Sequence, residues 1–261
     1  MSLYVKVTGQ GPDLVLLHGW AMHGGIFDGV IDELSNHYRV HCIDLPGHGR
    51  SADEPGCSRL EDLATAVAPL IADNAIILGW SLGGLLALKL AQQLRLRALI
   101  LVSSSPRFVA NAEWPHGMAP EVFAQFFSRL QQNLQGTVQD FLRLQVRGDA
   151  HATETFATLK ASLLQHSASP QTLQNGLAML RDADESAAVS NIHVPTLVIA
   201  GEYDRITHPE ACAQLARQLP NAQHVLIKRA GHAPFISHHD EFMIAVRNFL
   251  SSVSGEAALS G

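Results

Sequence analysis

The sequence predicts an α/β fold, in which a mostly parallel sheet is covered by helices on both faces and interrupted by an all-helical insertion. Short apolar runs alternate with helix-like segments, which is typical of buried parallel strands. The alternation stops between about Arg107 and Ser190, where helical stretches follow one another without a recognisable strand. With 261 residues, 47% of them hydrophobic and 16% charged, the chain suits one compact domain carrying an insertion.

Six apolar runs predict the strands of the sheet. They are LVLLHG (14–19), RVHCID (39–44), AIILG (75–79), RALILVS (97–103), TLVIAG (196–201) and HVLIK (224–228). The segment LYVKV (3–7) alternates in polarity, which favours an antiparallel edge strand. Helical patterns fill the intervals, for example LEDLATAVAPLIAD (60–73) and LLALKLAQQL (85–94).

The insertion contains four helical stretches with recognisable boundaries. They are PEVFAQFFSRLQQNL (120–134), GTVQDFLRLQVRG (136–148), TETFATLKASLLQH (153–166) and PQTLQNGLAMLRDADES (170–186). Pro120 and Pro170 fit first helical positions, and Ser169 fits an N-cap. Gly136 and Gly148 are expected to mark helix ends.

These patterns divide the chain into two parts. Residues 1–106 and 191–261 form the predicted core, and residues 107–190 form the helical insertion. Insertions at the carboxyl ends of the strands of an α/β sheet lie beside its ligand crevice, so we expect a lid over a site there. The alternative is that the insertion only adds packing.

The composition excludes several classes of partner. The net charge of −6 provides no basic surface for nucleic acid. The three cysteines are widely spaced and form no C-x-x-C pair, which fits a reducing compartment rather than a disulfide framework. There is no signal-peptide pattern, and no apolar run approaches the length of a membrane span. We expect a monomeric cytoplasmic protein that binds neither nucleic acid nor membrane.

The segment IILGWSLGG (76–84) places one serine between glycines where a strand changes into a helix. A serine hydroxyl is a weak nucleophile that needs a base, a group that orients the base, and donors for the oxyanion. A sharp strand-to-helix turn exposes the hydroxyl of Ser81 and puts the Leu82 N–H at a helix N-terminus. The motif alone is weak, but its position between strand and helix predicts that Ser81 is a nucleophile.

The partners of such a serine are expected later in the chain, an acid followed by a histidine. Strand 196–201 leads into Glu202-Tyr203-Asp204, and strand 224–228 leads into a loop with His232. Asp204 is the predicted acid. Glu202 directly abuts the strand and suits a structural role, whereas Asp44 follows an early strand and is out of order.

A second oxyanion donor is expected from the loop after an early strand, and the Trp20 N–H fits this position. The side chain of His18 is expected to hold that loop by hydrogen bonds to the backbone. No metal-ligand spacing and no phosphate-binding glycine loop is present, so we expect neither metal nor cofactor.

The motifs HGW, DLPGHGRS, GWSLGG, GEYDRITHP and AGHAPF occur in this order, and with them the chain resembles the α/β-hydrolases over roughly residues 2–250. GWSLGG, the passage SSSPRF…EWP (103–115), FLRLQ (141–145) and GHAPFISH (231–238) resemble the family of esterases that act on pimeloyl-acyl-carrier protein methyl esters in biotin synthesis. This resemblance implies the triad Ser81, Asp204 and His232, with Trp20 and Leu82 at the oxyanion site.

The resemblance also implies a substrate and its contacts. The substrate would be the methyl ester at the far end of a dicarboxylic acyl chain attached to acyl-carrier protein. The lid residues expected to contact the chain are Phe141, Leu142, Arg143, Leu144 and Gln145. Basic lid residues would dock the acidic carrier, but Arg129, Arg143, Arg147 and Lys160 stand beside Glu121, Asp140, Asp149 and Glu154, so the insertion is nearly neutral.

The residues predict a serine carboxylesterase, and the resemblance implies that its substrate is a pimeloyl-acyl-carrier protein methyl ester. One alternative is a general short-chain carboxylesterase or another α/β-hydrolase of small acyl substrates. Another is a non-catalytic protein that keeps the triad as part of a ligand pocket. Turnover of a simple activated ester would exclude the last alternative.

Overall fold

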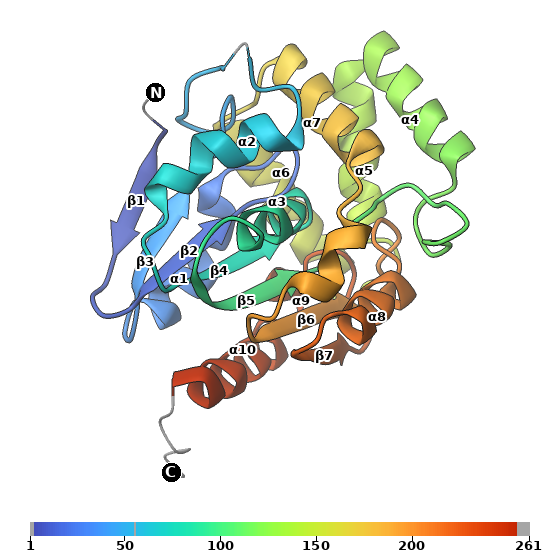
Figure 1. Ribbon diagram of the computed structural model, residues 1–261. Helices are drawn as coiled ribbons and strands as arrows, with labels where there is room; N and C mark the ends of the chain where they lie inside the picture. The colour runs from blue at the N-terminus through green and yellow to red at the C-terminus, as the bar shows by residue number, and fades with distance from the viewer. Residues whose placement is uncertain (1–2, 55, 255–261) are drawn as a thin grey trace.

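A computed structural model describes residues 3–54 and 56–254. Its centre is a seven-stranded sheet in the order β1-β3-β2-β4-β5-β6-β7 (Figure 1). The strands are β1 (Val5–Thr8), β2 (Asp13–Leu17), β3 (Arg39–Ile43), β4 (Ala75–Trp80), β5 (Leu96–Val102), β6 (Thr196–Gly201) and β7 (Ala222–Ile227). Strand β1 pairs antiparallel to β3 at one edge, and the remaining pairings are parallel. The predicted α/β class and the antiparallel edge strand are confirmed.

Helices cover both faces of the sheet, because alternate residues of its buried strands point to opposite sides. Leu14, Leu16, Ile76 and Leu78 face one apolar cluster, which also contains residues of α1 (Asp28–Leu34) and α10 (His239–Ser254). The opposite face packs against α2 (Leu60–Val67), α3 (Leu82–Ala91) and α8 (Pro209–Gln218). The short elements are η1 (Gly24–Phe27), η2 (Ala68–Leu70), η3 (Ser186–Asn191) and α9 (Pro234–Ser237).

Four helices lie between β5 and η3, and Figure 1 shows them stacked beyond one end of the sheet. They are α4 (Pro120–Gln132), α5 (Leu134–Gln145), α6 (Ala152–Gln165) and α7 (Pro170–Asp182). Pro120 and Pro170 are first helical residues, and the Ser169 side chain accepts a hydrogen bond from the Thr172 N–H. These start signals were predicted correctly because each depends on backbone groups within one helical turn.

The prediction for Gly136 was wrong. Gly136 lies in the first turn of α5, where its N–H donates to the side chain of Asn133. The break between α4 and α5 is at Asn133, whose side chain satisfies an amide that the helix leaves unpaired. Gly148 follows the end of α5 with φ +89°, a left-handed conformation that favours glycine.

No helix in the described ranges is long and apolar enough to cross a membrane. Residues 255–261 of the predicted core range lie outside the described residues.

Candidate active site

Ser81 occupies the turn between β4 and α3 with φ 56° and ψ −116°. A non-glycine residue with positive φ costs roughly 1–3 kcal/mol and persists only where its surroundings hold it. Here the Ser81 N–H donates to the Val102 carbonyl at 3.0 Å, and the Ser81 carbonyl accepts from the Ser104 hydroxyl at 2.7 Å. A Cβ on Gly83 would lie 2.8 Å from the His18 carbonyl oxygen, so this turn requires glycine there.

Two backbone N–H groups follow residues of this turn and have no acceptor within the described residues. Leu82 is the next residue and begins α3, while Trp20 follows Gly19, where a Cβ would lie 3.2 Å from the Ser81 Cβ. Among the described residues, neither the Leu82 N–H nor the Trp20 N–H has a hydrogen-bond acceptor. The loop that carries Trp20 is held by His18, whose Nδ1 bonds the Gly19 carbonyl at 2.9 Å while its Nε2 accepts from the Leu45 N–H. Burial lowers the pKa of His18 well below its ordinary value, so its imidazole is neutral.

His232 and Asp204 form a buried pair. The His232 Nδ1 donates to Asp204 Oδ2 at 2.8 Å, and both side chains are fully buried. Asp204 Oδ1 accepts from the Ile206 and Thr207 N–H groups at 2.8 and 2.9 Å, which fixes the carboxylate. The Nε2 of His232 has no hydrogen-bond partner in the described part of the chain. This imidazole therefore presents an unpaired nitrogen, and its other nitrogen is oriented by a carboxylate.

Trp80 connects this pair to Ser81. Its indole N–H donates to the His232 carbonyl at 2.8 Å, and the two ring centroids are 5.7 Å apart. The structure contains no hydrogen bond between Ser81 Oγ and His232 Nε2 within its described residues. Such contacts often tighten only when substrate binds, so the arrangement remains compatible with proton transfer.

The competing acids have structural partners. Glu202 accepts from the Arg229 N–H at 2.8 Å, and Lys228 lies 3.2 Å from the same carboxylate. The hydrogen bond from Arg229 and the nearby lysine lower the pKa of Glu202. Asp44 accepts from the Gly24 and Arg50 N–H groups and holds the loops after β2 and β3.

An apolar pocket of about 30 Å³ lies between the insertion and the core. Its walls come from the segment before α4, from α4, α5 and α7, and from the loop after β6. The lining residues are Phe108, Met118, Phe123, Phe126, Phe141, Leu144, Leu177, Leu180 and Ile206. Trp20 stands beside this pocket, edge-on to Phe141 with ring centroids 4.9 Å apart, and its indole N–H donates to the Leu173 carbonyl at 2.8 Å. The loop that carries Trp20 is thus in direct contact with the insertion.

The residues of the predicted segment 141–145 lie in different environments. Phe141 and Leu144 line the apolar pocket, whereas Leu142 packs into the cluster on the other side of the sheet. Arg143 is exposed and pairs with Asp140 at 2.9 Å. Gln145 is buried, its carbonyl accepts from the His232 N–H at 2.8 Å, and its side-chain amide has no partner among the described residues.

Several pocket residues were not predicted. Phe126 on α4, Leu177 on α7 and Ile206 after β6 line the same cavity as Phe141, although they are far apart in sequence. The sequence offers one signal for Phe126: it is one of two adjacent aromatic residues, Phe126 and Phe127, in a helix that buries few other residues. Only packing of the helices decides which of the two aromatic rings enters the pocket.

Two of the cysteines are poorly suited to act as nucleophiles. Burial raises the pKa of Cys42 to about 12 and that of Cys57 to about 11, so these thiols stay protonated at neutral pH. Within residues 3–54 and 56–254, no group of three or more His, Cys, Asp or Glu side chains is arranged to hold a metal ion.

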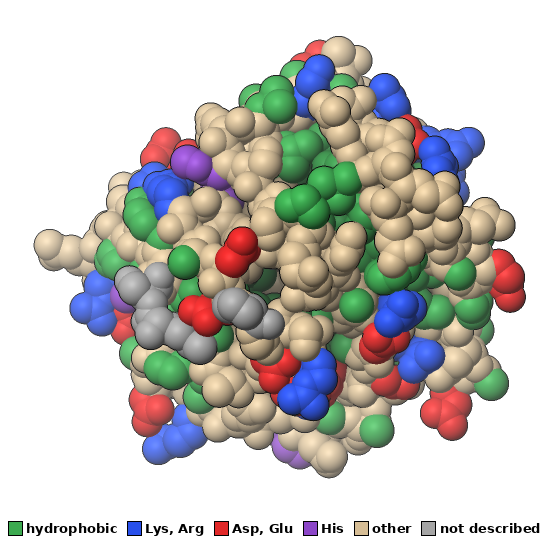
Figure 2. All heavy atoms as spheres, turned by 90° about the horizontal axis from the view of Figure 1, so that it is seen from above, with side chains coloured by type: hydrophobic (Ala, Val, Ile, Leu, Met, Phe, Trp, Pro, Cys, Tyr) green, Lys and Arg blue, Asp and Glu red, His purple; other side chains and the backbone are tan. Residues whose placement is uncertain are grey.

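The basic residues of the insertion are partly neutralised. Arg129 and Arg143 both pair with Asp140, at 2.8 and 2.9 Å, and together they line a shallow hollow. Arg147 and Lys160 are exposed. Figure 2 shows basic side chains scattered around the outline of the surface seen from above, several of them at its upper right, with apolar side chains also exposed nearer the middle.

Comparison with known proteins places these features in a family. The profile of the α/β-hydrolase fold matches residues 12–239. A pimeloyl-[acyl-carrier protein] methyl ester esterase of Stenotrophomonas maltophilia is 40% identical over 254 residues, covering 97% of this chain and 98% of that protein. The enzyme of the same name from Nitrosomonas europaea is 40% identical over 245 residues, covering 93% and 97%. In fold, an esterase from Exiguobacterium antarcticum superposes with a TM-score of 0.86 at 22% identity, covering 97% of this chain and 95% of that one.

Proposed function

The chain belongs to the α/β-hydrolase family, and from that premise we propose that it is a serine carboxylesterase that hydrolyses the methyl ester of a pimeloyl group on acyl-carrier protein. The observation that carries the chemistry is the buried 2.8 Å bond between His232 and Asp204, beside the strained turn of Ser81. The substrate is inferred from relatives that are 40% identical along nearly their whole length and carry this name.

In the first half of the reaction, His232 Nε2 takes the proton of Ser81 Oγ, and the oxygen attacks the ester carbonyl. The negative charge that develops on the carbonyl oxygen is stabilised by the N–H groups of Trp20 and Leu82. His232 then gives its proton to the departing methanol. The unpaired Nε2 of His232 and the two unpaired N–H groups support these roles.

In the second half, water attacks the acyl-enzyme, with His232 again acting as base, and the free acid leaves. Asp204 keeps the His232 proton on Nδ1 and stabilises the imidazolium that forms in each half. Every step uses groups of the protein itself, so the mechanism needs no cofactor.

The helices α4–α7 act as the lid. Because the apolar pocket beneath them measures only about 30 Å³, room for about two water-sized groups, the lid must open for the acyl chain to lie against this apolar wall. Phe141 and Leu144 contact the chain, which is compatible with their position in the pocket wall. Gln145 positions His232 through its carbonyl, and Leu142 anchors the segment in the core. Arg143 lies on the outer surface of the lid, where a carrier protein would approach. A monomeric state and a cytoplasmic location stay predictions.

The test compares two substrates at equal concentration. The kcat/KM is measured for a methyl pimeloyl ester attached to acyl-carrier protein and for the same ester on a small thiol. We expect the carrier-bound ester to be preferred by roughly tenfold or more, because an additional protein contact accelerates association. Equal values for both substrates would instead favour a general short-chain carboxylesterase, and no turnover of either would favour a non-catalytic protein.

A further inference from the structure

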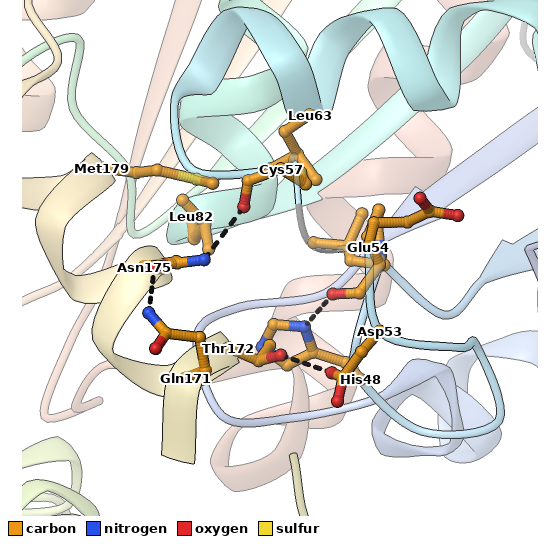
Figure 3. A pocket seen from close by; sticks show the side chains of 13 residues that line it. His48, Asp53, Glu54, Cys57, Leu63, Leu82, Gln171, Thr172, Asn175 and Met179 are labelled. Carbon is orange, nitrogen blue, oxygen red and sulfur yellow. Dashed lines mark hydrogen bonds between the residues drawn. The ribbon is translucent and has the colours of Figure 1, made fainter. Parts of the chain in front are cut away.

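The insertion contacts the core in several places, and two of them differ in what they hold. Along α7, beside a cavity of about 200 Å³, the Thr172 hydroxyl donates to Asp53 Oδ1 at 2.7 Å (Figure 3). This contact joins two side chains. The end of α5 instead meets the backbone of residues 229–232, which follow β7 and carry His232. We call residues 229–232 the histidine loop.

The histidine loop and the end of α5 share two backbone hydrogen bonds. The His232 N–H donates to the Gln145 carbonyl at 2.8 Å, and the Ala150 N–H donates to the Arg229 carbonyl at 3.0 Å. Gln145 and Ala150 belong to the insertion, so the backbone amide of the proposed base has its acceptor outside the core. The insertion therefore helps to hold this loop in addition to covering the site.

Asp149 adds a side-chain bond to the residue next to His232. It is 7% exposed, and its Oδ2 accepts from the Gly231 N–H at 2.6 Å while its Oδ1 accepts from the His151 N–H at 2.7 Å. Hydrogen bonds from N–H groups to a carboxylate are stronger than those between neutral groups. Because His151 is the N-cap of α6, one carboxylate joins the histidine loop to the start of that helix.

The packing at Gly231 shows how closely the two segments approach. A Cβ on Gly231 would clash with the Gln145 carbonyl oxygen and would lie 3.2 Å from Asp149 Oδ2. Gly231 does not have the left-handed φ that requires glycine, so alanine is compatible with its backbone. An alanine at this position would thus push the end of α5 away from the histidine loop.

The core holds the same loop through other groups. The Trp80 indole N–H donates to the His232 carbonyl at 2.8 Å, and the Tyr203 N–H donates to the Ala230 carbonyl at 2.8 Å. Both bonds use carbonyl oxygens of the loop. The N–H groups of Gly231 and His232 are bonded to the insertion, so the loop is fixed only when core and insertion act together.

We propose that Asp149 is a positioning residue for His232: by fixing the Gly231 N–H, it keeps the imidazole where Nε2 can take the proton of Ser81 Oγ. The inference rests on the proposed ester hydrolysis and assigns to the insertion a part in the chemistry itself. A shift of the loop moves Nε2 relative to Ser81, and small misplacements of a reacting group have large effects on rate.

The same contacts decide which part of the lid opens. The end of α5 stays on the core, because its departure would release the backbone of the histidine loop. Opening for the acyl chain falls to α4, which buries only Phe123 and Leu130. The acyl chain can therefore enter while His232 remains in place.

The first experiment measures kcat and kcat/KM on p-nitrophenyl butyrate. Asp149→Asn keeps the shape of the side chain but leaves one oxygen for two N–H groups. We expect kcat and kcat/KM to fall by the same factor, roughly 5- to 50-fold, because the variant displaces the base and leaves the apolar wall intact. Thr172→Val, which removes the bond between α7 and Asp53, is the matched control, and its kcat should stay within about twofold of the wild type.

Gly231→Ala disturbs the same contact from its other side and should also lower kcat. Since both changes act on one contact, the loss in Asp149→Asn/Gly231→Ala should be smaller than the product of the two single losses. Losses that multiply would show that the two residues act independently, and the proposed route from Asp149 through Gly231 would be wrong.

The second experiment reports on His232 directly. Its Nδ1 proton lies in the 2.8 Å bond to Asp204, and its NMR signal is assigned by its loss in His232→Gln. We expect this signal to shift or broaden in Asp149→Asn and to stay unchanged in Thr172→Val. If Asp149→Asn only melts at a lower temperature, while its kcat and this signal remain those of the wild type, Asp149 merely stabilises the fold and the proposal is wrong.

The proposed function and the role of Asp149 fail in different ways. If the wild type cleaves p-nitrophenyl butyrate but no pimeloyl methyl ester, the proposed substrate is wrong and the Asp149 comparison still holds on the activated ester. If it cleaves no ester, the proposed hydrolysis is wrong, and the Nδ1 signal alone decides whether Asp149 positions His232. If Asp149→Asn does not fold, Gly231→Ala provides both measurements.

Discussion

At the carboxyl edge of the sheet, the side chains of Ser81, Asp204 and His232 are at most 2% exposed, whereas α4 of the insertion buries only Phe123 and Leu130. The three core residues are held by backbone hydrogen bonds and by packed strands. The insertion contacts the core through buried apolar residues of α5, α6 and α7 and through hydrogen bonds, among them Trp20 to Leu173, Thr172 to Asp53 and His23 to Ser162.

The difference indicates that the core holds the reacting groups and that the insertion influences the choice of substrate. Catalytic groups must be held to within a fraction of an ångström, and buried strands provide that rigidity. Binding of a long acyl chain requires a cover that can open, and α4, which buries only two of its residues, is the part of the insertion that suits this purpose. Substitutions at the sheet edge should therefore affect the chemistry on every ester, and substitutions on the insertion away from Asp149 should affect the choice of substrate.

The largest effect is expected from Ser81→Ala. Without the nucleophile no acyl-enzyme forms, so kcat should fall roughly 10⁴-fold or more on free and carrier-bound esters alike. Steady-state turnover and mass spectrometry of the acylated protein provide the measurements. Ser128→Ala, an exposed serine of α4, is the control. A Ser81→Ala enzyme that keeps a tenth of its activity would show that the chemistry is elsewhere.

Next is Asp204→Asn, which would favour the wrong tautomer of His232 and lower kcat by up to roughly 10⁴-fold. The matched change Glu202→Gln lies two residues away and removes a carboxylate whose partners are Arg229 and Lys228. It should cost far less. The kcat values of the two variants are compared after their melting temperatures are shown to be unchanged. A larger loss of kcat in Glu202→Gln than in Asp204→Asn would make Glu202 the acid that orients His232.

The insertion is tested by Arg143→Glu/Arg147→Glu. If these exposed arginines steer an acidic carrier, kcat/KM for the carrier-bound ester should fall roughly tenfold at low salt. The loss should shrink as salt rises, because the Debye length falls from about 10 Å at 0.1 M to about 3 Å at 1 M. The free ester should be almost unaffected.

The control for this pair is Arg95→Glu/Arg217→Glu, which changes the net charge equally on exposed residues of the core. Equal losses on free and carrier-bound ester in the insertion variant would mean that the arginines support the packing of the lid. The role proposed for the insertion would then not include docking of the carrier protein.

The smallest effect concerns the junction between the two regions. His23 Nδ1 accepts from the Gly25 N–H, and its Nε2 bonds the Ser162 carbonyl of α6 at 3.0 Å, so the ring joins core and insertion in its neutral form. Burial lowers the pKa of His23, although the nearby Asp44 opposes this. The unfolded chain therefore takes up a proton at a higher pH than the folded protein.

The stability that neutral His23 contributes is complete above the unfolded pKa of about 6.5 and is lost as the pH falls towards the lowered folded pKa. The free energy of unfolding should drop by at most ~1.4 kcal/mol per pH unit for this group. Urea unfolding between pH 7.5 and 5 measures the loss, which should be smaller in His23→Gln than in the wild type. An identical pH dependence in both proteins would contradict this.

Most of the fold could be predicted from sequence because its signals are local. Apolar runs mark the strands, and Pro120, Pro170 and Ser169 mark helix starts through contacts within one turn. Chain order, together with the positions of Ser81, Asp204 and His232 directly after predicted strands, indicated these residues, since loops that follow parallel strands meet at one edge of the sheet. Their geometry agrees with that expectation, and their catalytic roles stay predictions until the variants are measured.

Other features depend on contacts between distant residues, and only the tertiary structure decided them. Residues 141–145 are consecutive in the sequence, but on α5 the Phe141 side chain packs against Trp20 whereas the Arg143 side chain faces solvent. Gly136 lies in the first turn of α5 and not at a helix end, because the Asn133 side chain caps that helix. His48 is one of 14 histidines, and its burial, with an Nε2 that has no partner among the described residues, results from the packing of the chain. The physical reason is that burial and hydrogen-bond pairing are properties of the packed chain, whereas strand periodicity and helix capping are properties of neighbouring residues.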